Sequence, residues 1–118
     1  MNVPTTILYF LFLFLVAGVA PNRADAMTDE ERAAQGFALL KKNCSRCHAI
    51  ELTGASPHPQ APPFRDVVKR YPVEDLEESL AEGIMSGHPD MPEFTFEADQ
   101  IDAIVAYLNS LKASENAK

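Results

Sequence analysis

Two cysteines and a histidine stand close together in the chain, in the run Cys44-Ser45-Arg46-Cys47-His48. On a helical turn, side chains at positions i, i+3 and i+4 face the same way. Both thiols can therefore reach the two vinyl groups of one porphyrin as thioethers, while the imidazole reaches the iron. Cys-x-x-Cys-His is typical of c-type haem attachment. We expect one covalent haem c, bound through Cys44 and Cys47, with His48 as an axial ligand of the iron.

Two other chemistries also use closely spaced cysteines. A thioredoxin-like dithiol would need a βαβ context, and the sequence shows none. A structural zinc site needs four ligands. The chain has no further cysteine, although His58 and His88 could in principle complete such a site. The helical context and the export signal described below favour haem over both.

A haem that only carries electrons usually has both axial positions filled, so a second ligand is expected downstream of His48. Met91 is our candidate, because it lies in a loop between two predicted helices and precedes Pro92, which restricts its backbone. Its neutral thioether would raise the reduction potential. His88 is the rival ligand and would lower the potential, and an open sixth position is the third alternative. Met85 suits core packing instead.

A bound haem also needs hydrogen-bond partners for its axial histidine and for its propionates. The free N–H of an axial histidine needs an acceptor, which fixes the orientation of the ring, and a loop carbonyl can serve. Pro62 and Pro63 lie in the loop after the motif and are candidates for this role. The propionates need donors, for which Arg65, Arg70 and Tyr71 are candidates.

Helices are expected to position these residues. Thr28 and Glu31 form a capping box for a helix over residues 28–43. Apolar residues at i, i+3, i+4 and i+7 predict a short helix over 64–71, which Pro72 ends.

A third helix is predicted over residues 74–83. A fourth is predicted from the helical spacing of five apolar residues, with Thr95 as a plausible N-cap: Ile101, Ile104, Val105, Leu108 and Leu111. The loops at 49–63 and 85–94 are too rich in proline and glycine for helix or central strand. No stretch shows strand-like alternation, so the expected class is all-α, with two loops that wrap a ligand.

The N-terminus has the pattern of an export signal. Residues 7–20 are an almost unbroken apolar run, and Ala24-Asp25-Ala26 is a small-x-small cleavage site. We expect a cleavable signal peptide at residues 1–26, a single domain at 27–118 and a periplasmic location without stable membrane insertion. An uncleaved anchor is the alternative, although the run is shorter than the roughly 20 residues that span a bilayer.

Charge is distributed unevenly along the chain. The net charge is −7, which disfavours nucleic-acid binding. Residues 27–70 carry seven basic and five acidic side chains, whereas residues 71–118 carry two basic and eleven acidic ones. This asymmetry either orients the protein on a redox partner or solvates exposed helix faces.

Taken together, these features resemble those of small bacterial class I cytochromes c. The resemblance covers about residues 36–111 and depends on four features in order. They are Gly36 eight residues before the first cysteine, CSRCH, GHPDMPEF and the C-terminal AIVAYLNSL. It implies a class I cytochrome c fold, in which the N- and C-terminal helices cross at Gly36 and Leu40 meets Ile104 and Tyr107.

The resemblance also implies roles for individual residues. The Pro62 carbonyl, two residues before Phe64, would accept a hydrogen bond from His48, and Met91 would lie on the opposite face of the haem. The implied function is a periplasmic mono-haem one-electron carrier. It would be a monomer that shuttles between a dehydrogenase or membrane complex and an acceptor.

Other functions remain open at this point. The chain could be a dedicated electron-accepting subunit of one complex. It could also be a haem-based sensor, a gas-binding protein or a weakly peroxidatic protein with an open or displaceable sixth ligand. Gas-binding cytochromes of the four-helix-bundle type carry the motif near the C-terminus, whereas here it follows the first predicted helix of the domain. No catalytic constellation is visible, so we predict no enzymatic activity.

Overall fold

The fold consists of four α-helices. The computed structural model describes residues 26–83 and 90–117, and no strand occurs among them. The helices are α2 (Asp29–Asn43), α3 (Phe64–Arg70), α4 (Val73–Glu82) and α5 (Ala98–Asn116). The expected all-α class is confirmed.

Some of the predicted features fall outside this part of the chain. Residues 1–25 of the expected signal peptide, the rival ligand His88 and the predicted core residue Met85 are not among the described residues.

The predicted capping box at the start of α2 is confirmed. The Thr28 N–H donates to Glu31 Oε2 at 2.8 Å, and the Glu31 N–H donates to Thr28 Oγ1 at 3.2 Å. The Thr28 N–H, and then the Thr28 hydroxyl, which donates to the same carboxylate oxygen at 3.0 Å, lower the pKa of the Glu31 carboxyl. The box satisfies two helix-end donors, so α2 begins at Asp29.

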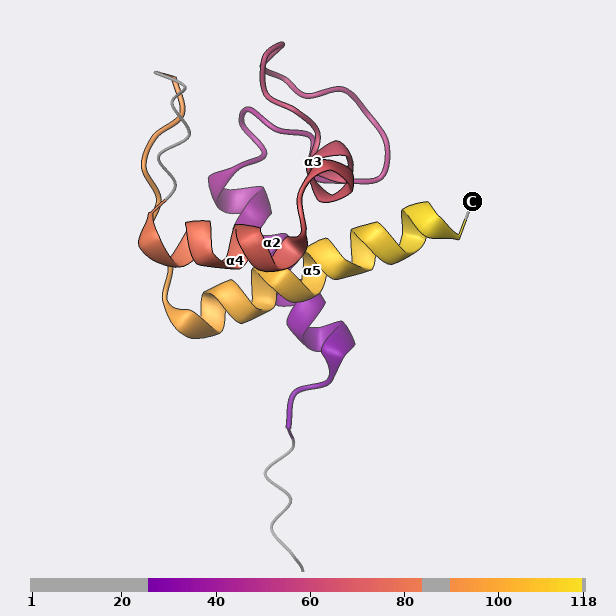
Figure 1. Ribbon diagram of the computed structural model, residues 1–118, viewed down its shortest axis with the longest axis vertical. Helices are drawn as coiled ribbons and strands as arrows, with labels where there is room; N and C mark the ends of the chain where they lie inside the picture. Colours follow the sequence, from indigo (N-terminus) through magenta and orange to yellow (C-terminus); the bar gives the residue numbers. More distant parts are fainter. Residues whose placement is uncertain (1–25, 84–89, 118) are drawn as a thin grey trace, which may run out of the picture.

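The helices α2 and α5 cross at the centre of the molecule (Figure 1). Gly36 is buried at the crossing. A Cβ at this position would lie 2.5 Å from the carbonyl carbon of Ala103 and 3.0 Å from the amide nitrogen of Ile104. Only glycine therefore allows the two backbones to approach this closely, as the resemblance implied.

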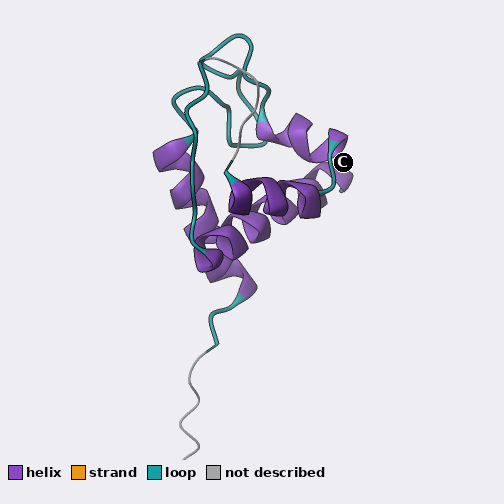
Figure 2. Ribbon diagram, turned by 60° about the vertical axis from the view of Figure 1, so that its left-hand side comes forward, coloured by secondary structure: helices purple, strands orange, loops and turns teal. Residues whose placement is uncertain are grey.

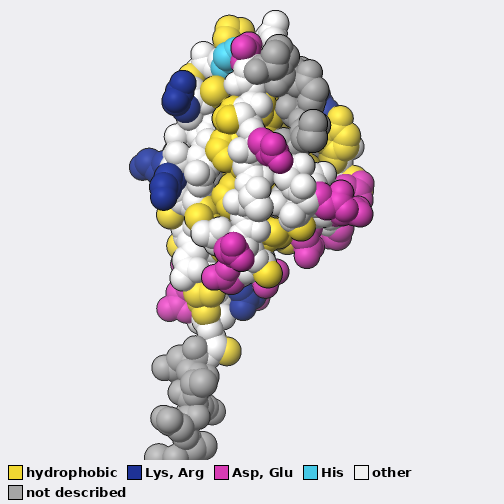
Figure 3. Space-filling view, turned by 90° about the vertical axis from the view of Figure 1, so that its left-hand side faces the viewer, with side chains coloured by type: hydrophobic (Ala, Val, Ile, Leu, Met, Phe, Trp, Pro, Cys, Tyr) yellow, Lys and Arg dark blue, Asp and Glu magenta, His cyan; other side chains and the backbone are white. Residues whose placement is uncertain are grey.

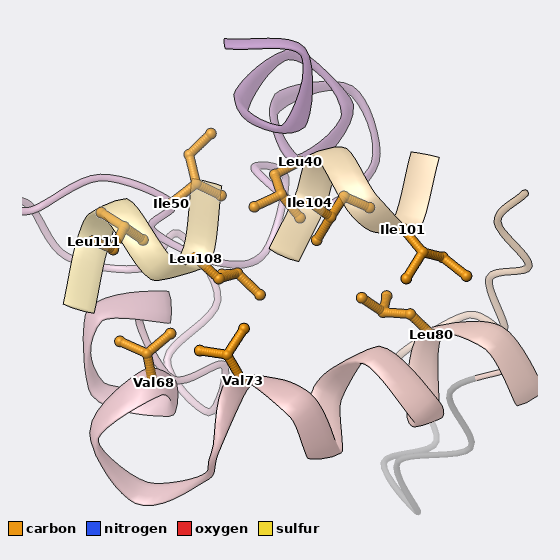
Figure 4. Packing of buried hydrophobic residues seen from close by; sticks show 9 residues of the cluster. All are labelled: Leu40, Ile50, Val68, Val73, Leu80, Ile101, Ile104, Leu108 and Leu111. Atoms are coloured by element: carbon orange, nitrogen blue, oxygen red, sulfur yellow. The ribbon is translucent and has the colours of Figure 1, made fainter. Parts of the chain in front are cut away.

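The core lies on the inner face of α5, where α2, α3 and α4 meet it. Figure 4 shows Leu40 beside Ile104, with Val68 and Val73 facing Leu108. The cluster comprises Leu40, Ile50, Val68, Val73, Leu80, Ile101, Ile104, Leu108 and Leu111. Each of these side chains is at most 6% exposed, so the first and last helices are held by one continuous apolar contact.

The expected N-cap Thr95 is wrong. The N-cap of α5 is Glu97, whose N–H donates to Gln100 Oε1 at 3.1 Å. Phe94 and Phe96 stack with their ring centroids 6.1 Å apart, and Phe96 packs against the core. This packing holds the chain in a non-helical path past Thr95, and the helix begins only at Ala98.

The loop at residues 49–63 lies at one end of the molecule, above the helices in Figure 2, and the segment that leads into α5 runs from that end down one side to the start of the helix. This loop connects the cysteine-histidine motif to α3. The second segment includes residues 90–97, which lead into α5 and contain Met91. The start of this second segment lies beside the first loop, because Oδ2 of Asp90 is 3.8 Å from Nε2 of His58.

Candidate functional site

The motif continues α2 by one further turn of backbone. Cys44 is the C-cap of α2, and its N–H donates to the Leu40 carbonyl at 2.7 Å. The N–H groups of Cys47 and His48 both donate to the Cys44 carbonyl, at 3.1 and 2.9 Å. The spacing of the motif therefore produces the compact turn that was expected, directly after the helix that carries Gly36.

The His48 ring is held by a backbone carbonyl. Its Nδ1 lies 2.8 Å from the Pro62 oxygen. A carbonyl can only accept, so Nδ1 carries the proton and Nε2 is the nitrogen with a free lone pair. The Phe64 ring stacks on the imidazole with a centroid distance of 5.2 Å, and the Phe64 N–H donates to the Ala49 carbonyl at 2.9 Å. These contacts fix the orientation of the imidazole ring.

The surroundings of the two thiols suit covalent attachment of a haem better than the redox chemistry of a dithiol enzyme. Cys44 and Cys47 are unpaired and half-buried. Burial, with a smaller contribution from the Cys47 thiolate, raises the pKa of Cys44 to about 11. A redox dithiol needs a cysteine with a lowered pKa, so the thioredoxin-like alternative is disfavoured.

A structural zinc site finds no support in the described part of the chain. No group of three or more His, Cys, Asp and Glu side chains there could hold a metal ion. The donor set is instead two thiols on one turn followed by an oriented imidazole, which suits a haem. Cys44 and Cys47 would hold its ring, and His48 its iron.

Met91 is half-buried in the segment between α4 and α5. Its neighbour Asp90 has its Oδ2 3.8 Å from Nε2 of His58, in the loop that follows His48. The Met91 segment therefore lies beside the loop that starts at the motif. Its role as an iron ligand stays a prediction.

The candidate donors for the propionates have different surroundings. The Arg65 guanidinium donates to the Glu51 carbonyl at 3.3 Å. Arg70 and Tyr71 line a surface pocket of about 380 Å³ between α3 and the end of α5, together with Lys112. Which of them meets a propionate stays a prediction.

Charge is separated on the surface as it is in the sequence. On the face in Figure 3, several Lys and Arg side chains lie along the left-hand edge, while acidic side chains extend over the middle and the right. Lys41, Lys42 and Arg46 are exposed beside the attachment turn. In contrast, the acidic residues of α4 are exposed along that helix: Glu74, Asp75, Glu77, Glu78 and Glu82.

Comparison with known proteins identifies the family. A family model described as Cytochrome c matches residues 33–112, from within α2 to within α5. The chain belongs to the cytochrome c family. Searches of curated proteins and of solved structures gave no match.

Family membership settles the cofactor and the general activity. A cytochrome c carries haem c covalently and transfers electrons to and from redox partners, and Cys44 and Cys47 have the spacing of that attachment. The predicted family, fold class and haem c are confirmed.

Several residues around this haem site were missed by the sequence analysis. The Phe64 stacking on His48, and the contact of Asp90 with His58, join residues that no local motif connects. Tyr107 was expected only as a crossing residue, yet its hydroxyl donates to the Ile50 carbonyl at 2.8 Å, two residues after His48. In a single sequence, the one available signal for such residues is that some of them, such as His58 and Phe64, lie within a few tens of residues of the Cys-x-x-Cys-His motif.

Replacing Cys44 with alanine is expected to leave a cytochrome with at most one thioether bond and a reduced yield of holoprotein. The remaining Cys47 can bond only one vinyl group of the porphyrin. Haem stain after denaturing electrophoresis, the mass of the haem-bound chain and the absorption spectrum measure this change.

Ser45→Ala is the matched control, because Ser45 lies within the motif but its hydroxyl only donates to the Lys41 carbonyl. Normal yield and an unchanged spectrum in the Cys44 variant would contradict the assignment of Cys44.

Replacing Tyr107 with phenylalanine is expected to lower the free energy of unfolding by about 1 kcal/mol at neutral pH, because one hydrogen bond to the Ile50 carbonyl is lost. Burial, and then the charge of Glu51, raises the pKa of Tyr107 above its usual 10.0. The folded state therefore holds this proton more tightly than the unfolded state does. Its contribution is complete below pH 10 and is lost as pH rises through the folded-state pKa.

The deficit of the Tyr107→Phe variant should accordingly shrink above about pH 10. Denaturant unfolding of both holoproteins at pH 7, 9, 10 and 11 measures this difference. A deficit that stays constant over this range would show that the Tyr107 proton has no linkage to folding.

Proposed function

We propose that this cytochrome c is an exported, periplasmic one-electron carrier whose single haem is ligated by His48 and Met91. When bound, the haem supplies an iron that alternates between the ferrous and ferric states. The main support is the 2.8 Å contact of His48 Nδ1 with the Pro62 carbonyl. That contact leaves Nε2 for the iron and increases the basicity of the ligand.

Met91 is supported as the second ligand by its position and chemistry. It is half-buried in the segment between α4 and α5, and the segment is tied to the loop that follows the motif. The backbone of Met91 is restricted by Pro92. A six-coordinate iron with a thioether ligand needs little rearrangement on changing its charge, which suits a carrier rather than a sensor with an open position.

Export is supported by the N-terminal pattern. We propose that residues 1–26 are a cleaved signal peptide and that residues 27–118 form the functional domain. The first described helix, α2, begins at Asp29, directly after the proposed cleavage site, and the family match lies within the proposed domain. No helix of the described residues has the length and apolarity needed to cross a membrane.

The surface supports short-lived docking with redox partners. The cations Lys41, Lys42 and Arg46 are exposed beside the attachment turn and form no ion pair with any other described residue. They suit an acidic patch on a donor or acceptor, because complementary charge increases the rate of encounter. We propose that the protein is a monomer and has no enzymatic activity of its own.

The test is an absorption spectrum in both redox states, recorded on protein exported from a host with c-type maturation machinery. Sharp bands of a low-spin c-type haem in the reduced form, with a weak far-red sulfur–iron band in the oxidised form, would support the proposed ligation. Haem without the far-red band would rule out Met91 and favour His88 or an open position. Mass spectrometry of the same sample shows whether the chain begins at Met27.

A further inference from the structure

We propose that His58 is a positioning residue for Met91, because it joins the haem-attachment turn to the residue next to that ligand. The inference rests on the proposed ligation by Met91. It concerns the contact between the loop at 49–63 and the start of the segment at 90–97, which meet at one end of the molecule (Figure 2).

The backbone of His58 is fixed to the attachment turn. Its N–H donates to the Cys47 carbonyl at 3.1 Å, across ten residues of loop. Its own carbonyl accepts from the Ala61 N–H at 3.1 Å. These two hydrogen bonds therefore hold the backbone of His58 at a fixed position relative to Cys47.

The imidazole of His58 is oriented as well. The Gln60 N–H donates to its Nδ1 at 3.3 Å, so Nδ1 is the acceptor and the proton of the neutral ring lies on Nε2. Nε2 faces the Asp90 carboxylate, with 3.8 Å between Nε2 and Oδ2. This distance is too long for a direct hydrogen bond, but it suits an electrostatic contact or one bridging water.

The contact links the two sides of the site. Cys47 would hold the haem ring, and Asp90 directly precedes Met91. Among the hydrogen bonds and ion pairs of the described residues, the contact of His58 with Asp90 is the one that joins residues 49–63 to residues 90–97. Losing it would free the Met91 segment from the attachment turn, so the sulfur would leave the iron more often.

The expected effect is modest, because both side chains are partly exposed, at 36% for His58 and 75% for Asp90. Electrostatic contacts between exposed groups are weak, so losing this contact should make Met91 about two- to five-fold easier to displace and should not abolish ligation. The haem stays attached in either case, because both thioethers are untouched.

The experiment is a titration of the oxidised holoprotein with imidazole, followed by loss of the far-red sulfur–iron band. His58→Ala should bind imidazole about two- to five-fold more tightly than the unmodified protein, and Asp90→Asn should show the same increase. The double variant should bind no more tightly than either single variant, because both remove one contact.

Lys69→Ala is the matched control. Lys69 makes a partly exposed ion pair with Glu115, and this pair joins α3 to α5 without touching the Met91 segment. Its variant should lose stability to denaturant without a change in imidazole affinity.

Three outcomes would overturn the inference. The first is an unchanged imidazole affinity in His58→Ala and Asp90→Asn, with the far-red band present in the unmodified protein, and this result would leave the ligation by Met91 standing. The second is an equal increase in Lys69→Ala, which would show a general loss of stability. The third is a missing far-red band in the unmodified protein, in which case the proposed ligation itself fails.

Discussion

Replacing Gly36 with alanine is expected to destabilise the cytochrome by about 3 kcal/mol or more, or to prevent its folding. Two effects oppose each other at this position. Glycine inside a helix costs about 1 kcal/mol relative to alanine, so helix propensity alone would predict a more stable variant. The added methyl group, however, would lie 2.5 Å from the carbonyl carbon of Ala103, and a backbone cannot turn away as a side chain can. The steric effect therefore wins, because α2 and α5 must separate.

Denaturant unfolding of the holoprotein measures this change. Gln35→Ala is the control, since Gln35 is the exposed neighbour on the same helix and its substitution should change stability by at most about 0.5 kcal/mol. A Gly36→Ala variant that is more stable than the unmodified protein would show that the helices do not meet backbone to backbone.

Replacing Met91 with alanine is expected to leave the haem attached and to open its sixth position. Carbon monoxide and cyanide should then bind readily, and the far-red band should disappear. The reduction potential should fall, on the order of 0.1 V, because a neutral thioether favours the ferrous state and its replacement by water or hydroxide does not. Ligand titrations and a spectroelectrochemical potential measure both effects.

Met85→Leu is the control for this variant, because Met85 is the other methionine between α4 and α5 in the sequence. It should retain the far-red band and the potential. Unchanged ligand binding by the Met91 variant, or loss of the band in the Met85 variant alone, would assign the ligand elsewhere.

The helices of this protein could be predicted largely from local chemistry. The Thr28–Glu31 box, the apolar spacing of α3 and the position of Pro72 each act over a few residues, and the bounds of α2 and α3 follow them closely. The apolar spacing that predicted α5 locates this helix but not its ends, since it extends from Ala98 to Asn116. The cap of α5 could not be predicted in the same way. The Thr95 side chain is suited to an N-cap. The start of the helix is instead decided by the packing of Phe96 against core residues that are distant in the sequence.

In the haem site, too, the local features could be predicted from the sequence and the long-range contacts could not. The motif and the Pro62 acceptor could be predicted, the first from spacing and the second from family resemblance, and the structure places Pro62 O 2.8 Å from His48 Nδ1. The contacts of Tyr107 with Ile50 and of His58 with Asp90 join residues 57 and 32 positions apart. The local spacing of residues does not predict such pairs, because these contacts depend on the path that the loops take over the packed helices.

The crossing of α2 with α5 sets an order of events during synthesis. The first helix of the domain finds its partner surface only in the last one, so the core at Gly36 cannot form until α5 has been made. A chain that emerges N-terminus first presents Cys44 and Cys47 while that partner is still missing. Both thiols are then open to a haem-attaching enzyme, and folding afterwards leaves them half-buried. Attachment of both thioethers is therefore easiest while α2 and α5 have not yet packed together.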